Sequence, residues 1–127
     1  MSQPITLVIA DDHPLFRKGL HEVIESDPTL KIIGEASDGT AAFAMIQQHM
    51  PMIAVLDIDM PKMGGLDVAR EIQQGKLEAD VIFLTMYQEE DLFNEAMDAG
   101  ARAYVLKDSA VIDILNAIHT VADGKYY

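Results

Sequence analysis

The sequence contains no cysteine, few basic residues and no long apolar segment. Without cysteine, the protein cannot form a disulfide, bind zinc through thiolates or use a thiol nucleophile. The apolar runs are far shorter than the roughly 20 residues that a membrane-spanning helix needs, and the N-terminus lacks the basic and apolar regions of a signal peptide. We therefore expect a soluble, cytoplasmic domain that does not contact a membrane.

The charge balance is strongly acidic. Nine Lys and Arg residues stand against 21 Asp and Glu residues, which gives a formal net charge of −12 at pH 7. Because Lys and Arg supply most contacts to phosphate, this balance predicts no direct nucleic-acid contact by this segment. It agrees with a cation site or a basic partner, although solvated acidic helix faces account for most of the surplus.

The length of 127 residues fits one domain, and a hydrophobic share of 50% is enough to build a core. Five short apolar runs bounded by turn residues are typical of buried strands: Ile5–Ala10, Leu30–Ala36, Met52–Asp57, Val81–Leu84 and Ala103–Leu106. Apolar residues at helical spacing follow each run. Pro14 fits the first turn of the first helix and Gly100 the end of the fourth, and Asp108 or Ser109 can cap the fifth. The alternation predicts an α/β fold with a parallel sheet, right-handed crossovers and helices on both faces.

Polar side chains follow four of the five predicted strands: Asp11 and Asp12, Asp57, Thr85, and Lys107. In a parallel sheet these strand ends lie at one edge, where open α/β sheets bind their ligands. Two carboxylates about 4 Å apart repel by roughly 4 kcal/mol at an effective dielectric of about 20, so three of them need a compensating cation. An all-oxygen cluster suits Mg²⁺.

Asp57, placed between a magnesium ion and the Lys107 ammonium, could act as a covalent acceptor of a phosphoryl group. Thr85 could then donate its hydroxyl to a phosphoryl oxygen. Taken singly, Asp57 also fits a turn cap, Thr85 a strand-end hydroxyl and Lys107 a surface lysine. The site therefore rests on the joint pattern. The four histidines show no ligand spacing, so a histidine metal site is not expected.

The whole pattern resembles the receiver domain of two-component response regulators. The matching residues are Asp11-Asp12 after the first strand, Asp57 in LDIDMPKMGG, Thr85 in VIFLTMY and Lys107 in GARAYVLKDS. The resemblance runs from Ile5 to Gly124 and implies a flavodoxin-like (βα)5 fold with strand order 2-1-3-4-5.

By this resemblance, Asp57 is the phosphoacceptor. Asp12 and Asp57 would bind Mg²⁺ together with the backbone carbonyl of Asp59, and Asp11 would act on the ion through water. The resemblance thus implies that the predicted cation site binds Mg²⁺ and indicates which residues are its ligands.

The same resemblance assigns three further residues. Thr85 and Lys107 would hold the phosphoryl group, and Tyr104 would be an aromatic switch residue that moves together with Thr85. Such a domain is a signalling module rather than an enzyme, although it can catalyse its own phosphorylation and dephosphorylation.

Three segments, IADDHPLFRKGL, DIDMPKMGGLD and AGARAYVLKDS, are similar to receivers of the NarL/FixJ (LuxR-type) transcription regulators. This similarity implies a receiver domain over residues 1–124, with residues 125–127 starting a linker to a helix-turn-helix output domain outside this sequence. It also implies a sensor histidine kinase as phosphodonor, control of transcription through the output domain, and a homodimer as a further assembly.

Two positions leave questions open. In many receivers a proline follows the lysine and its peptide bond is cis; here Asp108 follows Lys107, and a non-proline cis bond costs about 2.5–4 kcal/mol. The side chain of Asp59, beside the phosphoacceptor, could position water or repel phosphate. Either effect would alter the lifetime of the phosphorylated form.

Two other functions compete with this interpretation. Asp57 and Asp59 also fit the aspartate-x-aspartate signature of haloacid-dehalogenase-type phosphatases, but here the Asp11-Asp12 pair comes first and 127 residues leave no room for a cap domain. A receiver that binds partners without being phosphorylated is the third hypothesis. The complete acidic cluster and Lys107 argue against it.

Overall fold

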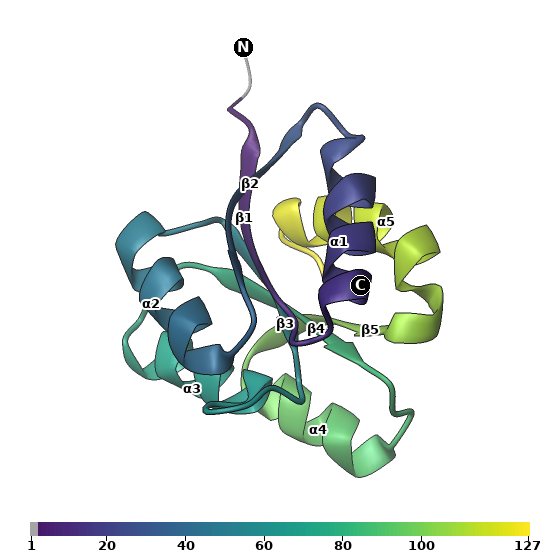
Figure 1. The fold of residues 1–127 in the computed structure, drawn as a ribbon. Coiled ribbons are helices and arrows are strands. Elements are labelled where there is room, and N and C mark those ends of the chain that lie inside the picture. The colour runs from purple at the N-terminus through teal and green to yellow at the C-terminus, as the bar shows by residue number, and fades with distance from the viewer. Residues whose placement is uncertain (1–2) are drawn as a thin grey trace.

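The computed structural model describes residues 3–127 (Figure 1). Its strands are β1 (Ile5–Ala10), β2 (Leu30–Ala36), β3 (Ile53–Asp57), β4 (Asp80–Thr85) and β5 (Ala101–Leu106). Its helices are α1 (Pro14–Glu25), α2 (Gly39–His49), α3 (Gly65–Gln74), α4 (Glu90–Asp98) and α5 (Ala110–Ala122), with a short 3₁₀ helix, η1 (Lys107–Ser109), before α5.

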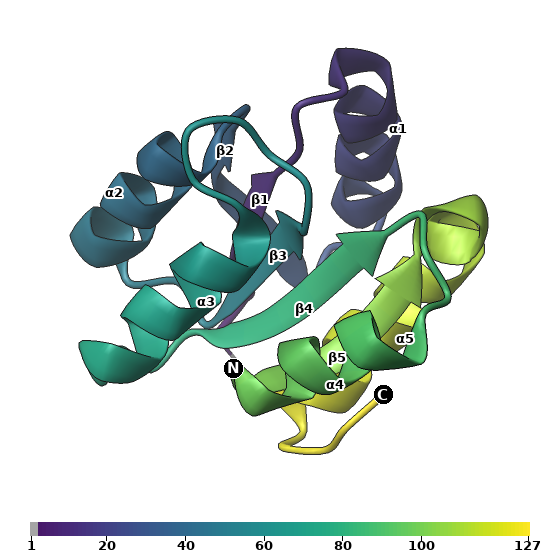
Figure 2. The same ribbon diagram turned by 90° about the horizontal axis from the view of Figure 1, so that it is seen from below.

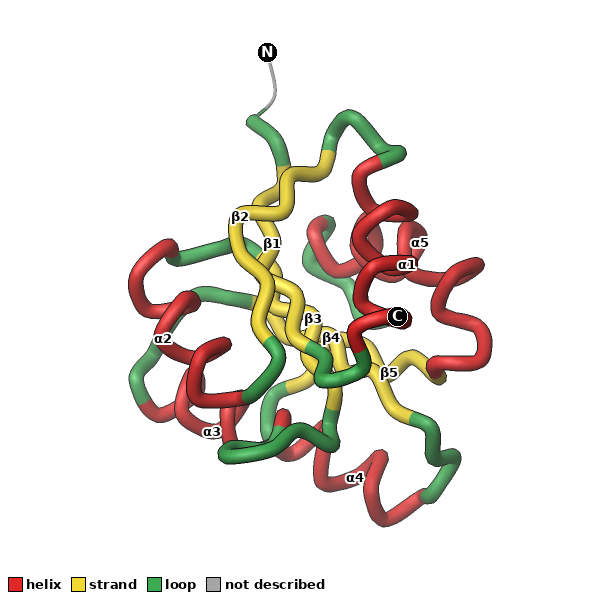
Figure 3. The backbone as a smooth tube through the Cα atoms, viewed as in Figure 1, coloured by secondary structure: helices red, strands yellow, loops and turns green. Residues whose placement is uncertain are grey.

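All five strands lie parallel in one sheet, in the order β2-β1-β3-β4-β5. Figure 3 shows this sheet as the central layer between the helices. The architecture confirms the predicted flavodoxin-like fold and its strand order. Because the chain runs in one direction through every strand, all five carboxyl ends meet at one edge.

Two hydrophobic clusters hold the helices against the sheet. On one face, strand residues such as Leu7, Val55 and Leu84 pack with buried residues of α1 and α5. On the other face, residues such as Val8 and Phe83 pack with α2, α3 and α4. Figures 1 and 2 show α1 and α5 on the side of the sheet opposite to α2 and α3. The alternation of strand side chains between two covered faces explains why the strands are apolar runs without a polar side.

The element ends agree with the sequence patterns at most positions. Strand β3 is buried at all five residues and begins one residue after the exposed Met52. Pro14 is the first residue of α1, and Gly100 follows α4 with a φ of 94°, a conformation that glycine adopts without the steric cost of a Cβ. The predicted cap of α5 is wrong: Ser109 occupies the N-cap position, but its side chain makes no capping hydrogen bond there. Its hydroxyl instead donates to the carbonyl of Leu106 across the η1 turn.

Candidate functional site

The carboxyl edge of the sheet gathers the predicted polar residues. Asp11 follows β1, Asp57 ends β3, Thr85 ends β4 and Lys107 follows β5. The side chains of Asp11, Asp57 and Thr85 are buried, which is unusual for polar groups and sets them apart from the many exposed acids of this chain. Residues nearly a hundred positions apart in the sequence therefore meet in one place.

Lys107 crosses the site and joins two of the carboxylates. Its Nζ lies 2.9 Å from Asp57 Oδ2 and 2.8 Å from Asp11 Oδ2. Burial on its own would lower the pKa of Lys107, but the contacts with Asp11 and Asp57 outweigh it, and the pKa is raised above its ordinary value. At neutral pH the side chain is thus an ammonium that is fixed between two acids.

Asp57 is the most perturbed group of the site. Burial, together with the nearby charge of Asp11, raises the pKa of Asp57 from 3.8 to about 6, although the hydrogen bond from Lys107 opposes the rise. The backbone amide of Asp59 donates to Asp57 Oδ1 at 3.1 Å. At pH 7 the carboxylate is mostly ionised but poorly solvated, which is the state of a reactive nucleophile.

The acidic cluster fits a divalent cation. One oxygen each from Asp11, Asp12 and Asp57 lies within 4.8 Å of the others and of a ring nitrogen of His13. The buried oxygen Asp12 Oδ1 accepts no hydrogen bond, and the buried oxygen Asp11 Oδ2 is paired with the Lys107 ammonium at 2.8 Å. A buried anionic oxygen without a donor is costly, and a bound cation removes this cost. One ammonium does not balance three carboxylates.

Thr85 and Tyr104 lie beside this cluster rather than in it. The Thr85 hydroxyl accepts a hydrogen bond from the backbone amide of Tyr87 at 3.1 Å, and the Tyr104 hydroxyl donates to the carbonyl of Tyr87 at 2.8 Å. The Tyr104 ring packs edge-on against Phe93 of α4, with ring centroids 5.3 Å apart. The two predicted switch residues are therefore connected through one residue of the β4–α4 loop.

The structure bears on the Lys107–Asp108 peptide bond and on the side chain of Asp59. No peptide bond between residues 3 and 127 is cis, so the Lys107–Asp108 bond is trans. Asp59 contributes its amide to the site, as described above, while its side chain is exposed to solvent.

Two residues of the site were not predicted from the sequence. His13 Nδ1 lies 3.1 Å from Asp11 Oδ1 and 3.0 Å from Lys107 Nζ, and the ring of Phe16 lies beneath the ammonium, with its centroid 4.9 Å from Lys107 Nζ. The signal for His13 was its position directly after the acid pair. The helical spacing of Phe16 indicated only a core residue.

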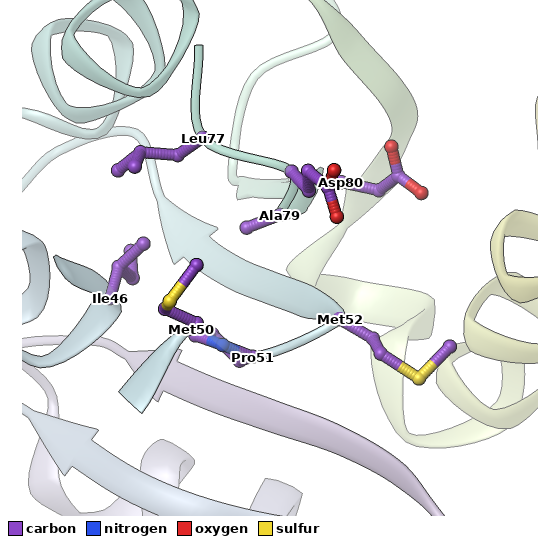
Figure 4. A pocket seen from close by; sticks show the side chains of 8 residues that line it. Ile46, Met50, Pro51, Met52, Leu77, Ala79 and Asp80 are labelled. Atoms are coloured by element: carbon purple, nitrogen blue, oxygen red, sulfur yellow. The ribbon is translucent and has the colours of Figure 1, made fainter. Parts of the chain in front are cut away.

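One pocket of the described residues lies away from this site. Figure 4 shows this pocket of about 260 Å³, lined by Ile46, Met50, Pro51, Met52, Leu77, Glu78, Ala79 and Asp80. These residues belong to α2 and to the segments that enter β3 and β4, so the pocket lies at the amino edge of the sheet, opposite to the acidic cluster. It contains none of the predicted site residues.

A parallel five-stranded sheet with buried acids and a lysine at its carboxyl edge defines the receiver class of signalling domain, and comparison with known proteins agrees. The sequence model of the response regulator receiver domain matches residues 7–119. The chain belongs to this family, and within it to the NarL/LuxR type. It is a signalling domain rather than a classical enzyme.

Several curated relatives are transcriptional regulators. The NarL regulatory protein of Mycobacterium tuberculosis is 35% identical over 98% of this chain and 60% of its own length. The nitrate/nitrite response regulator NarL of Escherichia coli is 31% identical over 97% of this chain and 57% of its own length. The chain therefore spans somewhat more than half the length of the relatives that it matches.

Solved structures give the same classification. The signal receiver domain of NarL from Mycobacterium tuberculosis superposes with a TM-score of 0.94 at 34% identity, over 98% of this chain and all of that one. A LuxR-family response regulator from an Aurantimonas species superposes with a TM-score of 0.91 at 31% identity, over 98% of this chain and 89% of its own.

Among residues 3–127, no helix is both long enough and apolar enough to cross a membrane.

Proposed function

We propose that this receiver accepts a phosphoryl group on Asp57 from the phosphohistidine of a sensor histidine kinase. The observation that carries the proposal is the buried Asp57 carboxylate, held by Lys107 and lying among Asp11 and Asp12. In the transfer, the phosphorus–nitrogen bond of the donor breaks, and a bond forms between phosphorus and an oxygen of Asp57. The histidine keeps the electron pair of the broken bond.

The residues around Asp57 bind Mg²⁺ and neutralise the charge of the phosphoryl group. Asp11, Asp12 and Asp57, with the backbone carbonyl of Asp59, would hold Mg²⁺, which when bound neutralises charge on the phosphoryl oxygens. Lys107 already faces Asp57 and contributes a fixed positive charge on the other side. The same residues serve autophosphorylation from small donors and the later hydrolysis of the aspartyl phosphate.

Thr85 and Tyr104 couple the phosphorylation of Asp57 to a conformational change. Once Asp57 is modified, the Thr85 hydroxyl turns away from the amide of Tyr87 and donates a hydrogen bond to a phosphoryl oxygen. The β4–α4 loop then moves, and the hydrogen bond from Tyr104 to the carbonyl of Tyr87 breaks. The face formed by α4, β5 and α5 therefore differs between the two states.

Membership of the family supports a proposal about the biological context of this chain. We propose that residues 1–124 form the receiver unit, that residues 125–127 begin a linker, and that a helix-turn-helix output domain of the same parent protein reads DNA in the cytoplasm. This segment itself, with its net charge of −12, contacts neither nucleic acid nor membrane. Phosphorylation releases the output domain or promotes a homodimer.

Uptake of label from radiolabelled acetyl phosphate in the presence of Mg²⁺ tests the proposal. The wild-type chain takes up one phosphoryl group, Asp57→Asn takes up none, and a chelator abolishes uptake by the wild type. Asp59→Asn is the matched control: it retains uptake and changes only the lifetime of the label. Wild-type uptake by Asp57→Asn would show that another residue is the acceptor.

A further inference from the structure

Arg17 joins the first turn of α1 to the ends of two strands. Its guanidinium Nη1 donates to the backbone carbonyl of Asp11 at 2.6 Å and reaches the carbonyl of Ala36, the last residue of β2, at 3.5 Å. The side chain is only 23% exposed, so it lies largely against the protein. One side chain therefore connects α1 with the carboxyl ends of β1 and β2, beside the acidic cluster.

Glu35 of β2 fixes the direction of this guanidinium. Its Oε1 lies 3.5 Å from Nε of Arg17, and its Oε2 lies 2.6 Å from Nδ1 of His21, one turn further along α1. A guanidinium is planar and its N–H groups point in fixed directions, so an acid at Nε and carbonyls at Nη1 together set its orientation. These contacts hold Arg17 toward the Asp11 carbonyl.

The carbonyl that Arg17 binds belongs to the peptide group between Asp11 and Asp12. Asp11 is fully buried, and its own amide donates to the Ala36 carbonyl at 3.1 Å, which continues the pairing of β1 with β2. Beyond Asp11 the chain leaves the sheet. Because a peptide group is planar, the direction of the Asp11 carbonyl also sets the direction in which the chain proceeds to Asp12. Arg17 thus holds the chain where it turns into the site.

The two acids joined by this peptide group both belong to the acidic cluster. One oxygen each of Asp11, Asp12 and Asp57 lies within 4.8 Å of the others. The Asp11 carboxylate is also fixed by its own contacts, since Oδ1 accepts from the amide of His13 and Oδ2 lies 2.8 Å from the Lys107 ammonium. The Asp12 side chain is 33% exposed and has no such donors, so its position depends on the backbone that carries it.

We propose that Arg17 is a positioning residue of the cation site. It contacts neither the ion nor the phosphoryl group, and it holds the peptide group between Asp11 and Asp12 so that both carboxylates lie close to Asp57. The inference rests on the proposed function and deepens it. Groups that orient metal ligands typically contribute about 10- to 100-fold to metal affinity, which sets the size of the effect to expect.

The charge of Arg17 and its positioning role predict opposite effects on cation binding. A guanidinium near the site repels a divalent cation, so the loss of its charge alone would tighten the binding of Mg²⁺. The loss of the contact with the Asp11 carbonyl would weaken that binding, because Asp12 would no longer be held close to Asp57. The direction of the change in the dissociation constant therefore separates the two roles.

The test is the dissociation constant for Mg²⁺, measured by titration calorimetry on the metal-free chain. Arg17→Met, which keeps an unbranched side chain without charge or donor, is expected to raise this constant by about tenfold or more. Arg17→Lys keeps the charge but not the planar fork, and it is expected to raise the constant by a smaller factor. If Arg17→Met does not fold, Arg17→Lys decides the question.

Hydrogen exchange in a chelator gives a second readout that needs no ion. The amide of His13 donates to Asp11 Oδ1 at 2.8 Å, in the turn that the Arg17 contact holds. Its exchange is expected to be severalfold faster in Arg17→Met than in the wild type, relative to the amides in the centre of β3.

Arg102→Met is the matched control. Arg102 also donates from Nη1 to a backbone carbonyl, that of Gly124 at 3.4 Å, and its Nε lies 3.9 Å from Asp80 Oδ1 of the neighbouring strand. These contacts are near the start of β5, at the edge of the sheet opposite to the acidic cluster. The control variant is expected to keep the wild-type Mg²⁺ constant and the wild-type exchange of the His13 amide.

The outcomes separate this inference from the proposed function. If the wild type binds Mg²⁺ and Asp57 accepts a phosphoryl group, but the Arg17 variants keep the wild-type constant or bind Mg²⁺ more tightly, the inference is wrong and the proposed function stands. An equal loss in Arg102→Met would also overturn the inference, since the effect would then come from general destabilisation. If the wild type binds no Mg²⁺ and takes up no phosphoryl group, both are overturned.

Discussion

Asp57 is buried next to Asp11, and for this reason its pKa is about 6 in the folded protein against 3.8 for an exposed aspartate. The folded state therefore holds this proton more tightly than the unfolded state does. Stability falls as the pH rises from about 4 to about 6, and the full cost is present above that window. Keeping Asp57 ionised in the folded protein therefore lowers the free energy of unfolding at neutral pH.

The variant Asp57→Asn removes this cost. In a chelator at pH 7.5, we expect its free energy of unfolding to exceed that of the wild type by on the order of 2 kcal/mol, because a shift of one pKa unit corresponds to about 1.4 kcal/mol. The gain disappears below about pH 4, where the acid is protonated in both states. Urea unfolding at the two pH values measures the difference. A variant less stable than the wild type at pH 7.5 would contradict the electrostatic argument.

The pKa of Asp27 is shifted in the direction opposite to that of Asp57. Its carboxylate lies 2.7 Å from Nε2 of His119 on α5 and also accepts hydrogen bonds from the amide and hydroxyl of Thr29. The hydrogen bond with His119, together with those from Thr29, lowers the pKa of Asp27 to about 2. This stabilisation is present above about pH 4 and is lost as the pH falls toward 2.

We expect Asp27→Asn to lower the free energy of unfolding at pH 7 by about 1 kcal/mol, because one charged acceptor is lost. The difference between variant and wild type shrinks as the pH falls from about 4 toward 2, since Asp27 then binds a proton more readily in the unfolded than in the folded wild type. Urea titrations from pH 7 to pH 2.5 follow this convergence. A difference that stays constant across the range would mean that the charge of Asp27 contributes nothing.

Two glycines fix how the elements meet around the site. A Cβ at Gly39, the first residue of α2, would overlap the carbonyl of Met63, and a Cβ at Gly65, the first residue of α3, would overlap the carbonyl of Asp57. Both helices begin where the backbone of the β3–α3 segment passes closely. Neither carbonyl group can move away without shifting the backbone of the β3–α3 segment, which begins at Asp57.

We expect Gly39→Ala and Gly65→Ala each to lower the free energy of unfolding by about 2–3 kcal/mol. Gly65→Ala also slows phosphoryl uptake, since it displaces the backbone of Asp57. Gly19→Ala is the matched control, because a Cβ there meets no atom within 4 Å and Gly19 lies inside α1. Alanine at that position stabilises by about 0.5–1 kcal/mol through helix propensity. Equal effects at all three positions would contradict the close approach.

The strands were predictable because each is an apolar run that ends at a polar residue, and the observed strands end at or within one residue of the predicted positions. The gathering of Asp11, Asp57 and Lys107 was predictable as well, since parallel strands bring their carboxyl ends together. The family and the fold followed from the same motifs.

Other features depended on side-chain directions that spacing does not reveal. The Ser109 hydroxyl turns back to Leu106 because η1 precedes α5, so the predicted cap does not form. His13 is one of four scattered histidines by sequence, and only the turn into α1 brings its ring onto the acids. The contact of Phe16 with Lys107 likewise requires the crossing of α1 over the sheet edge.

At the scale of the whole molecule, the net charge of −12 acts against the compact state. Like charges repel across the surface, and salt screens them, with a Debye length of about 10 Å at 0.1 M and about 3 Å at 1 M. We expect the Tm in a chelator to rise by several degrees between about 50 mM and about 500 mM sodium chloride. Circular dichroism melts measure the change. A Tm that falls over this range would show that attractive ion pairs, rather than net repulsion, dominate.

The most direct measurement of the central claim locates the phosphoryl group itself. The chain is incubated with acetyl phosphate and Mg²⁺, the acyl phosphate is reduced with borohydride, and the modified residue is identified by peptide mass spectrometry. We predict that reduction occurs at Asp57 alone and that it requires both the donor and Mg²⁺. Modification of a different acid, with Asp57 unchanged, would contradict the account.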